Sequence, residues 1–391
     1  MSHIYIVSPT ESLATKRGDR HPTLAKYLVE NGHAVTYVTS DFSHSDKTIL
    51  SAEALSEMTR VAPYKIDIIK TSGYQSNVSL ARLRWNIYVA LAVVRRLRNR
   101  ITHNDVLLIP SRPPEMLVAA HILKRRTGCK VVVDIRDVWP EGLPLGDNIK
   151  SKMFASYCRL IYRRWLRGMD GYAHTAPVFL DWLEAYAGHR NSVFVPLGFD
   201  EQRWETATPL VPGATSCPIE LLFVGNMTAS MDVSSLLKRP TGNGRYRFTF
   251  VGGGNGLDAV RAHLKIPNVD NIEMLGFLSR DRVVAELRKR HISVIPMRSH
   301  IVFPNKLFDA LGACRPLLVL GDNDAGRFVS EHGIGWNLPF DAATVGEFLD
   351  NLTIEDICVK SKNISKIRKS FSRKQVYRNL IELIEGSSQV N

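Results

Sequence analysis

Short apolar, mostly β-branched runs alternate with helical segments along almost the whole chain, and this alternation restricts the possible folds most. Strands that alternate with helices form parallel sheets covered by helices on both faces. The first series of expected strands covers residues 4–8, 34–39, 67–70, 105–109, 130–134, 171–174 and 192–196, and the second covers 219–224, 247–251, 272–275, 292–295 and 317–320. Because 391 residues exceed one ordinary core, two series predict two α/β domains.

The boundary between the domains is expected where the composition changes. Residues 199–218 are rich in Pro, Thr and Gly, which favours a hinge. We therefore predict one domain at residues 1–198 and a second at 199–370, followed by a segment at 371–391 whose residues 371–384 have helical spacing.

Composition restricts the class of protein. Apolar residues make up 45% of the chain, which is typical of a globular protein, and we expect neither a membrane-spanning helix nor a signal peptide. The five cysteines are scattered without a CxxC pair, and the twelve histidines show none of the spacings typical of metal ligands. This pattern favours a reducing cytoplasm and predicts neither a disulfide framework nor a metal site.

The net charge of +13 is concentrated in the first half, where residues 1–200 contain 27 Lys and Arg against 18 Asp and Glu. A basic surface can favour nucleic acid, an anionic membrane or a phosphorylated substrate. Nucleic-acid modules usually add a recognisable motif, and the chain has none, so we expect no nucleic-acid partner.

Two segments, residues 80–100 and 151–168, combine apolar and aromatic residues with many arginines. One interpretation is that these helices lie on an anionic membrane surface, which would make the protein peripheral on the inner face of the cell membrane. The other is that they pack on the sheet, with arginines near their C-termini complementing the helix dipoles. Both interpretations can hold together.

The segment VVVDIRDVWPE at residues 131–141 joins a buried strand to a dense polar cluster that includes Arg136 and Asp137. In open parallel sheets, ligands bind at the carboxyl ends of the strands, so this cluster is a candidate site. The alternative is a strand end whose charges face water.

Three further segments carry candidate ligand-binding residues. Gly18, in a long loop after the first strand, would let the backbone approach a ligand, unless the loop is merely a surface loop. Residues 251–256 are glycine-rich and suit either a nucleotide or a tight turn. Asn305 and Lys306 precede a helix, where they could hold a phosphate, and Asp309 one turn later could accept a ribose hydroxyl. The alternative there is an ordinary capped helix.

Taken together, these motifs resemble those of the GT-B glycosyltransferases of family 4, and within that family the bacterial surface-polysaccharide enzymes. The most specific landmarks are SRPP at residues 111–114 with DIRDVWPE at 134–141. Others are VPLGFDEQRW at 195–204, LLFVGN at 221–226, FVGGG at 250–254 and FPNKLFDALG at 303–312.

The resemblance implies two Rossmann-like domains that face each other across a cleft, with the terminal helix crossing back to the first domain. It also implies a retaining transferase of the hexosyl or N-acetylhexosaminyl type that needs no metal or other cofactor. The donor, expected to be a UDP-sugar, would bind the C-terminal domain. A glycan or lipid-linked acceptor would approach the N-terminal domain.

The resemblance also implies roles for individual residues. Gly225 and Asn226 would approach the diphosphate, and Gly253 and Gly254 the nucleotide, with Lys306 near the diphosphate. Arg136 and Asp137 stand where the family has a His-Asp pair that contacts the donor sugar. Asp309 stands at the second Glu of the family's Glu-x7-Glu motif, whereas Ile301 occupies the place of the first.

Two other functions fit the same architecture. A sugar-nucleotide epimerase would need a denser set of acid and base residues than the motifs provide. A non-catalytic subunit that supports a partner enzyme would be consistent with Ile301 in place of the first Glu.

Overall fold

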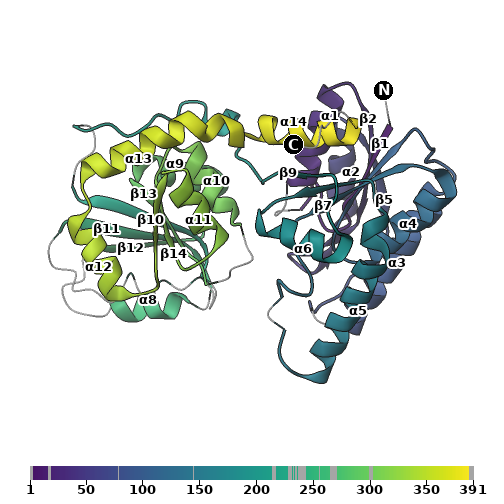
Figure 1. Cartoon of the computed structure of the whole chain (residues 1–391), viewed down its shortest axis with the longest axis horizontal. Helices are drawn as coiled ribbons and strands as arrows, with labels where there is room; N and C mark the ends of the chain where they lie inside the picture. Colours follow the sequence, from purple (N-terminus) through teal and green to yellow (C-terminus); the bar gives the residue numbers. More distant parts are fainter. Residues whose placement is uncertain are drawn as a thin grey trace. The chain divides into compact units, whose positions relative to one another are not determined.

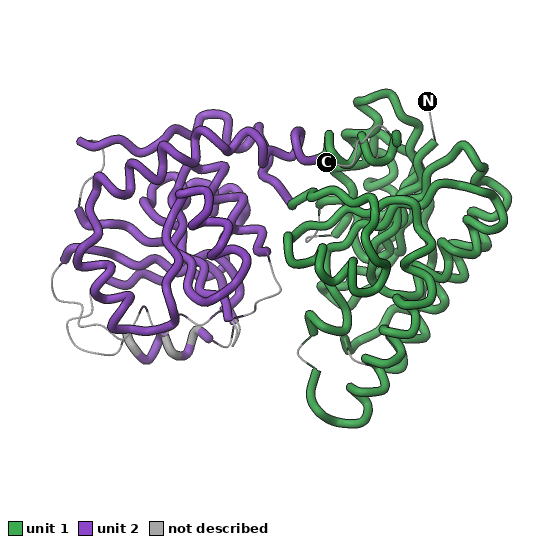
Figure 2. Tube along the Cα trace, in the orientation of Figure 1, with its two compact units in different colours: residues 1–196, 377–391 green, residues 197–376 purple. Residues whose placement is uncertain are grey.

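The computed structural model forms two compact units, residues 1–196 with 377–391 and residues 197–376 (Figures 1 and 2). It describes residues 3–15, 19–77, 79–143, 145–213, 217–227, 231, 233, 236, 244–254, 256–264, 271–298 and 303–386. The chain therefore passes between the units twice, at residues 196–197 and 376–377.

Unit 1 is built on a parallel sheet with the strand order β5-β2-β1-β6-β7-β8-β9. These strands are β1 (His3–Val7), β2 (Ala34–Ser40), β5 (Lys65–Ile69), β6 (Val106–Pro110), β7 (Lys130–Ile135), β8 (Gly171–His174) and β9 (Ser192–Phe194). A short hairpin, β3 (Phe42–Ser43) and β4 (Thr48–Ile49), follows β2. The strands β6 and β7 are almost entirely buried, as expected for the centre of a parallel sheet covered on both faces.

The helices of unit 1 are α1 (Arg20–Glu30), α2 (Ala52–Val61), α3 (Leu80–Leu97), α4 (Glu115–Thr127), α5 (Ile149–Trp165) and α6 (Val178–Ala187). In Figure 1, α3, α4 and α5 lie side by side, and α4 contacts both neighbours. Side-chain caps begin two of them: Ser79 accepts a hydrogen bond from the backbone N–H of Arg82, and Asn148 accepts one from Ser151.

Unit 2 contains a second parallel sheet with the order β12-β11-β10-β13-β14-β15. Its strands are β10 (Ile219–Asn226), β11 (Tyr246–Gly253), β12 (Ile272–Gly276), β13 (Ile292–Pro296), β14 (Leu317–Leu320) and β15 (Gly335–Leu338). Its helices are α8 (Leu257–Leu264), α9 (Arg280–Lys289), α10 (Asn305–Gly312), α11 (Asp324–Glu331), α12 (Ala342–Asn351) and α13 (Ile354–Ile367). Phe223, Phe248, Phe250 and Leu318 lie in its hydrophobic core.

The last helix, α14 (Arg373–Glu385), begins in unit 2 and ends in unit 1. On unit 1 it buries Tyr377, Leu380 and Leu383. The hydroxyl of Tyr377 donates a 3.1 Å hydrogen bond to the carbonyl of Arg20, and the Lys130 ammonium donates to the carbonyls of Leu383 and Ile384 at 2.7 and 2.9 Å. These contacts fix the end of the described chain to the first sheet.

The predicted fold class, two doubly wound parallel-sheet α/β domains, is confirmed, and all twelve expected strands are present with ends shifted by at most two residues. The helix α2 and the strand β15 were not predicted. Residues 199–218 were predicted as a hinge, and the described part of this segment belongs to unit 2. Trp204 is fully buried there, and its carbonyl accepts a hydrogen bond from Arg368. None of the described helices combines the length and apolar character needed to span a membrane.

Candidate functional site

In unit 1, the site lies where the strand order reverses. The strand β1 is flanked by β2 on one side and β6 on the other, so the loops after β1 and β6 leave in different directions. Crevices at such switch points, at the carboxyl ends of the strands, are where open α/β sheets bind ligands. The loop after β1 carries Glu11 and leads into α1, whose first residues are Arg20 and His21.

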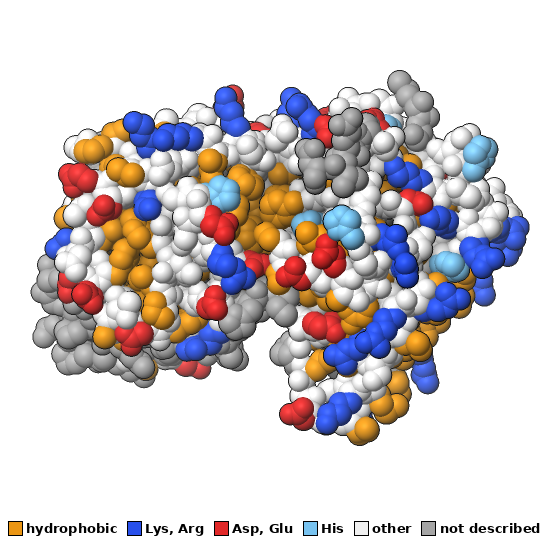
Figure 3. Space-filling view, viewed as in Figure 1, with side chains coloured by type: hydrophobic (Ala, Val, Ile, Leu, Met, Phe, Trp, Pro, Cys, Tyr) orange, Lys and Arg blue, Asp and Glu red, His pale blue; other side chains and the backbone are white. Residues whose placement is uncertain are grey.

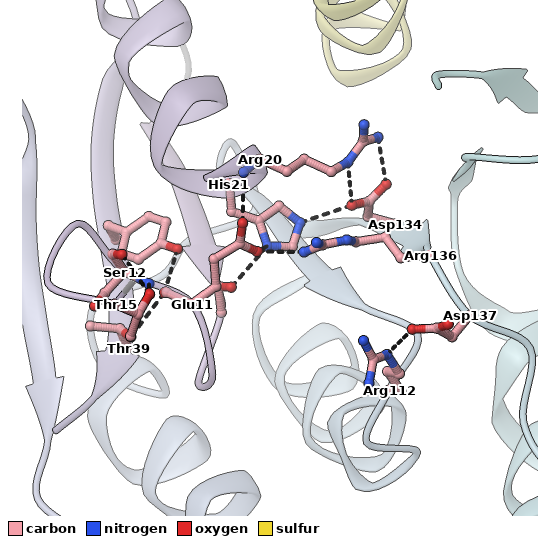
Figure 4. A network of polar contacts seen from close by, with 12 residues as sticks. Glu11, Ser12, Thr15, Arg20, His21, Thr39, Arg112, Asp134, Arg136 and Asp137 are labelled. Atoms are coloured by element: carbon pink, nitrogen blue, oxygen red, sulfur yellow. Dashed lines mark hydrogen bonds and ion pairs between the residues drawn. The ribbon is translucent and has the colours of Figure 1, made fainter. Parts of the chain in front are cut away.

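Asp134, near the end of β7, is the buried centre of a polar network (Figure 4). Arg20 donates two hydrogen bonds to its carboxylate, each at 2.9 Å, and Nε2 of His21 lies 2.9 Å from Oδ2. A third Arg20 hydrogen bond reaches the carbonyl of Pro196 at 3.0 Å. Since a carboxylate only accepts, His21 donates from Nε2, and Nδ1 faces the Ser8 hydroxyl at 2.9 Å.

Glu11 forms the second half of the same network. Its Oε1 accepts a 2.6 Å hydrogen bond from the backbone N–H of Arg20, and its Oε2 forms an ion pair with Arg136. Nδ1 of His21 lies 3.5 Å from Oε2. The backbone carbonyl of Glu11 accepts from Tyr37 at 2.7 Å and from Thr39 at 3.2 Å, which fixes the loop on β2.

The pKa values in this network favour the charged forms. Burial alone would raise the pKa of Asp134, but Arg20 and His21 hold it well below its usual value. Burial alone would also raise the pKa of Glu11, but Arg136 and His21 hold it below its usual value. Burial would lower the pKa of Arg136, but Glu11 and Asp134 raise it above its usual value. The network therefore holds two guanidinium groups against two carboxylates.

Arg136 and Asp137, predicted as a pair, have different partners. Arg136 turns toward Glu11, whereas the carboxylate of Asp137 forms an ion pair with Arg112 in the loop after β6 (Figure 4). The Ser111 hydroxyl donates to the carbonyl of Asp137 at 3.2 Å, so the loops after β6 and β7 are held together. Arg112 and Arg136 line a pocket in unit 1 together with His21 and Asp134.

In unit 2, the glycine-rich ends of β10 and β11 lie side by side. Gly225 pairs with Gly252 and Asn226 with Gly253. A Cβ on Gly252 would lie 2.0 Å from the carbonyl oxygen of Gly225, and the φ of Gly252 is +125°, so only glycine fits there. Asn226 is exposed at the end of β10, and a Cβ on Gly254 would meet its side-chain oxygen at 2.5 Å.

The side chain of Lys306 in α10 points to the end of β10 at Gly225. Its Nζ lies 3.0 Å from where a Cβ of Gly225 would be, 4.3 Å from the centre of the Phe223 ring and 3.7 Å from the sulfur of Met231. Burial lowers the pKa of Lys306 to about 8. Among the residues that the structure describes, no carboxylate pairs with this ammonium. A cation without an anionic partner beside the backbone of a strand end suits a phosphate.

The helix α10 begins after Pro304, which provides no side-chain cap. Asn305 is exposed at its first position, and Asp309 is partly buried one turn later. The first N–H groups of such a helix favour an anion.

The structure thus brings Gly225, Asn226, Gly253, Gly254 and Lys306 to one sheet edge in unit 2. Gly18 and Ile301 lie outside the described residues. Sequence reasoning missed Glu11, Arg20, His21 and Asp134 as one network. The only signal for it was the density of charge in the loop before α1, because Asp134 lies more than 110 residues from Arg20 and His21. Among the described side chains, no group of three or more His, Cys, Asp or Glu is arranged to hold a metal ion.

The chain matches none of the protein-family models with which it was compared. It is 23% identical over 303 residues to the "Probable glycosyltransferase WbjE" of Pseudomonas aeruginosa, across 72% of this chain and 74% of that protein. Among solved structures, a glycosyltransferase from Rickettsia africae ESF-5 matches 99% of this chain and 98% of that one, with a TM-score of 0.70 and 14% identity. The structure of Anabaena Alr3699/HepE in complex with UDP matches 99% of this chain and 100% of that one, with a TM-score of 0.68 and 12% identity. These likenesses show the GT-B fold.

Proposed function

We propose that this protein is a retaining glycosyltransferase that moves a sugar from a UDP-sugar to a glycan or lipid-linked acceptor in surface-polysaccharide synthesis. The relative from Pseudomonas aeruginosa supports the activity, and the UDP in the Anabaena protein supports the donor class. The observation that carries the proposal is the position of Lys306 against Gly225, at the switch point of the second sheet.

The reaction breaks the bond between the anomeric carbon of the sugar and the terminal phosphate oxygen, and it joins that carbon to an acceptor hydroxyl oxygen, whose proton passes to the departing UDP. Negative charge grows on the departing UDP, so groups that bind this charge lower the barrier. Lys306 would bind a diphosphate oxygen, together with backbone N–H groups at Gly225 and Asn226. Gly253 and Gly254 would let the nucleotide approach, Asn305 would contact the phosphates, and Asp309 would accept a ribose hydroxyl.

Arg136 and Asp137 of unit 1 are proposed to position the reacting sugar or the acceptor. Arg136 is 25% exposed although its guanidinium pairs with Glu11, so one side of it can still donate to a ligand. The network around Asp134 holds that guanidinium in place, and a preorganised donor loses little free energy when it binds.

The exposed faces of α3 and α5 favour a peripheral membrane protein on the cytoplasmic side. Leu80, Ile87 and Leu91 of α3 are 72, 43 and 46% exposed, and Ile149, Met153 and Leu160 of α5 are 70, 65 and 66% exposed. Arginines and lysines stand among them, and Figure 3 shows hydrophobic and basic side chains together over these helices. The other side of α3 packs on the unit through Trp85, Val89 and Val93. An exposed apolar stripe flanked by cations suits an anionic lipid surface.

The experiment that tests the proposed function is calorimetric titration of the whole chain with UDP and with a panel of UDP-sugars. We expect Lys306→Met to weaken UDP binding by about tenfold to a hundredfold, because a charged hydrogen bond to phosphate is lost. Lys362→Met removes the same charge from an exposed position of α13 and serves as the control. Equal UDP affinity in both variants, or no binding of any UDP compound, would contradict the proposal.

A further inference from the structure

The pocket at the switch point of unit 1 has a wall that the network around Asp134 does not use. This wall is formed by His44, Tyr74, Arg82, Trp85, Arg112 and Trp139, which come from the β3–β4 hairpin, the loop after β5, the start of α3 and the loops after β6 and β7. Asp134 is the one acid among the described lining residues, and Arg20 and His21 already satisfy it. The lining therefore holds more arginines than acids, although Glu11 and Asp137, outside the lining, pair with Arg136 and Arg112, and the charge of Glu115 acts on Arg82.

Arg82 is held rigidly in this wall. Its guanidinium lies 5.6 Å from the centre of the Tyr74 ring and 5.1 Å from that of Trp139, and Nη1 donates to the carbonyl of Asn77 at 2.7 Å. Its Nε is buried and has no acceptor among the described residues, and the same holds for Nε1 of Trp85. These two atoms are covered by protein, but the Arg82 guanidinium itself lines the pocket and has further N–H groups beyond the one bonded to Asn77, which a ligand with acceptor atoms can meet.

Neighbouring charges support this view. Burial, with the cations Lys47, Arg82 and Arg112, lowers the pKa of His44 to about 4, so His44 stays neutral and the field around it is positive. Arg112 does have a partner in Asp137, but that pair is exposed, with side chains 38 and 45% accessible. Such a pair is weak and can give way to a stronger anion.

The ligand that fits carries several acceptor oxygens, at least one negative charge and an apolar portion for the two rings. A phosphoryl group has such oxygens and suits planar guanidinium donors. We propose that this pocket binds a phosphate or diphosphate that belongs to the acceptor substrate. The inference rests on the proposed function, because it assigns a chemical class to the acceptor of that reaction.

The source of the phosphate is inferred from the position of α3. Arg82 and Trp85 lie in its first two turns, and the exposed residues Leu80, Ile87 and Leu91 belong to the same helix. A phosphate that joins a sugar to a membrane lipid would therefore reach this pocket while the lipid stays beside the helix. The acceptor phosphate is accordingly that of a lipid-linked glycan.

The test uses geranyl diphosphate, a short phosphorylated lipid, with geraniol and inorganic pyrophosphate as comparison probes. Calorimetric titrations are made with the full chain carrying Lys306→Met, which removes the diphosphate partner proposed in unit 2. We expect Arg82→Gln to weaken geranyl diphosphate binding at least about tenfold, and Arg82→Lys to weaken it less. Arg84→Gln, an exposed arginine of the same helix, should bind as the parent does.

The outcomes separate the two proposals. If Arg82→Gln and Arg84→Gln bind geranyl diphosphate equally, or if geraniol binds as well as its diphosphate, the inference is overturned. If pyrophosphate binds as tightly as geranyl diphosphate and depends on Arg82, the phosphoryl site stands and its source is a soluble acceptor. Arg112→Gln provides a second lining variant if Arg82→Gln does not fold. UDP binding to the unmodified chain reports independently on the proposed function.

Discussion

At the scale of single residues, Lys306 shows how a residue proposed to bind a ligand can lower stability. Its pKa of about 8 means that unit 2 holds an ammonium in a place that disfavours charge. Below pH 8 the lysine is charged in both the folded and the unfolded chain, so the cost is fully present. As the pH rises from 8 past the unfolded value near 10.5, the folded state loses its proton and the cost disappears.

We therefore predict that Lys306→Met raises the free energy of unfolding of unit 2 by about 1–3 kcal/mol at pH 7. The gain should shrink toward zero above pH 10, where both states of the unmodified chain carry a neutral lysine. Urea unfolding of the variant and the unmodified chain at several pH values measures this gain in the free energy of unfolding. A gain that did not change with pH would mean that added apolar contact, and not relief of the charge, is its cause.

Asp134 illustrates the opposite case, in which charge stabilises a core. Replacing it with Asn leaves the buried guanidinium of Arg20 without its carboxylate, and we predict a loss of about 3–5 kcal/mol from unit 1. Because the pKa of Asp134 is lowered, its contribution is present at neutral pH and is lost as the pH falls below the unfolded value near 3.8. Thermal unfolding of both proteins at pH 7 and at about pH 2 measures both.

The matched control is Asp137→Asn, which breaks an exposed ion pair with Arg112. We expect a change below about 1 kcal/mol there, since solvent screens such pairs. Similar losses in the two variants would show that the Asp134 network does not support unit 1.

At the scale of elements, the paired ends of β10 and β11 depend on glycine. We predict that Gly252→Ala destabilises unit 2 by about 3 kcal/mol or more, because the new Cβ would collide with the backbone of Gly225 and φ stays at +125°. Gly276→Ala is the control, since its φ is +66° but nothing lies within 4 Å of the new Cβ. Gly276→Ala should lower the free energy of unfolding by about 1–2 kcal/mol, which chemical unfolding measures.

Elements were easier to predict than contacts. The strands were predicted correctly because buried parallel strands are continuous apolar runs such as Val131–Val133. The strand β15 was missed because Gly335 and Asn337 interrupt any such run. The contact between Lys306 and Gly225 was expected only through family resemblance. The ion pair of Glu11 with Arg136 has no sequence signal at all, because it depends on how the sheet folds.

The helix α3 shows why helical periodicity gave two interpretations. It is apolar on a buried side, through Trp85 and Val93, and also on an exposed side, through Ile87 and Leu91. A helix packed only on a sheet shows one apolar stripe. The second stripe is the observation on which the proposed membrane contact rests.

At the scale of the whole molecule, we predict that the chain sediments with vesicles containing anionic lipid at low salt. Replacing Ile149, Met153 and Leu160 of α5 with Ser should reduce the bound fraction severalfold, since each exposed apolar side chain contributes about 1 kcal/mol or more when lipid buries it. Val359→Ser, at an exposed position of unit 2, should have no effect. Binding that persists in the triple variant would place the contact elsewhere.

The division of α14 between the units has a consequence for synthesis on the ribosome. Residues 377–386 cover part of unit 1, where Leu380 and Leu383 are completely buried, yet they are translated after all of unit 2. The nascent first domain therefore waits with an uncovered apolar surface until residues 377–386 have been synthesised. A chain that stopped before residue 377 would leave that surface exposed, a recognisable target for chaperones and proteases.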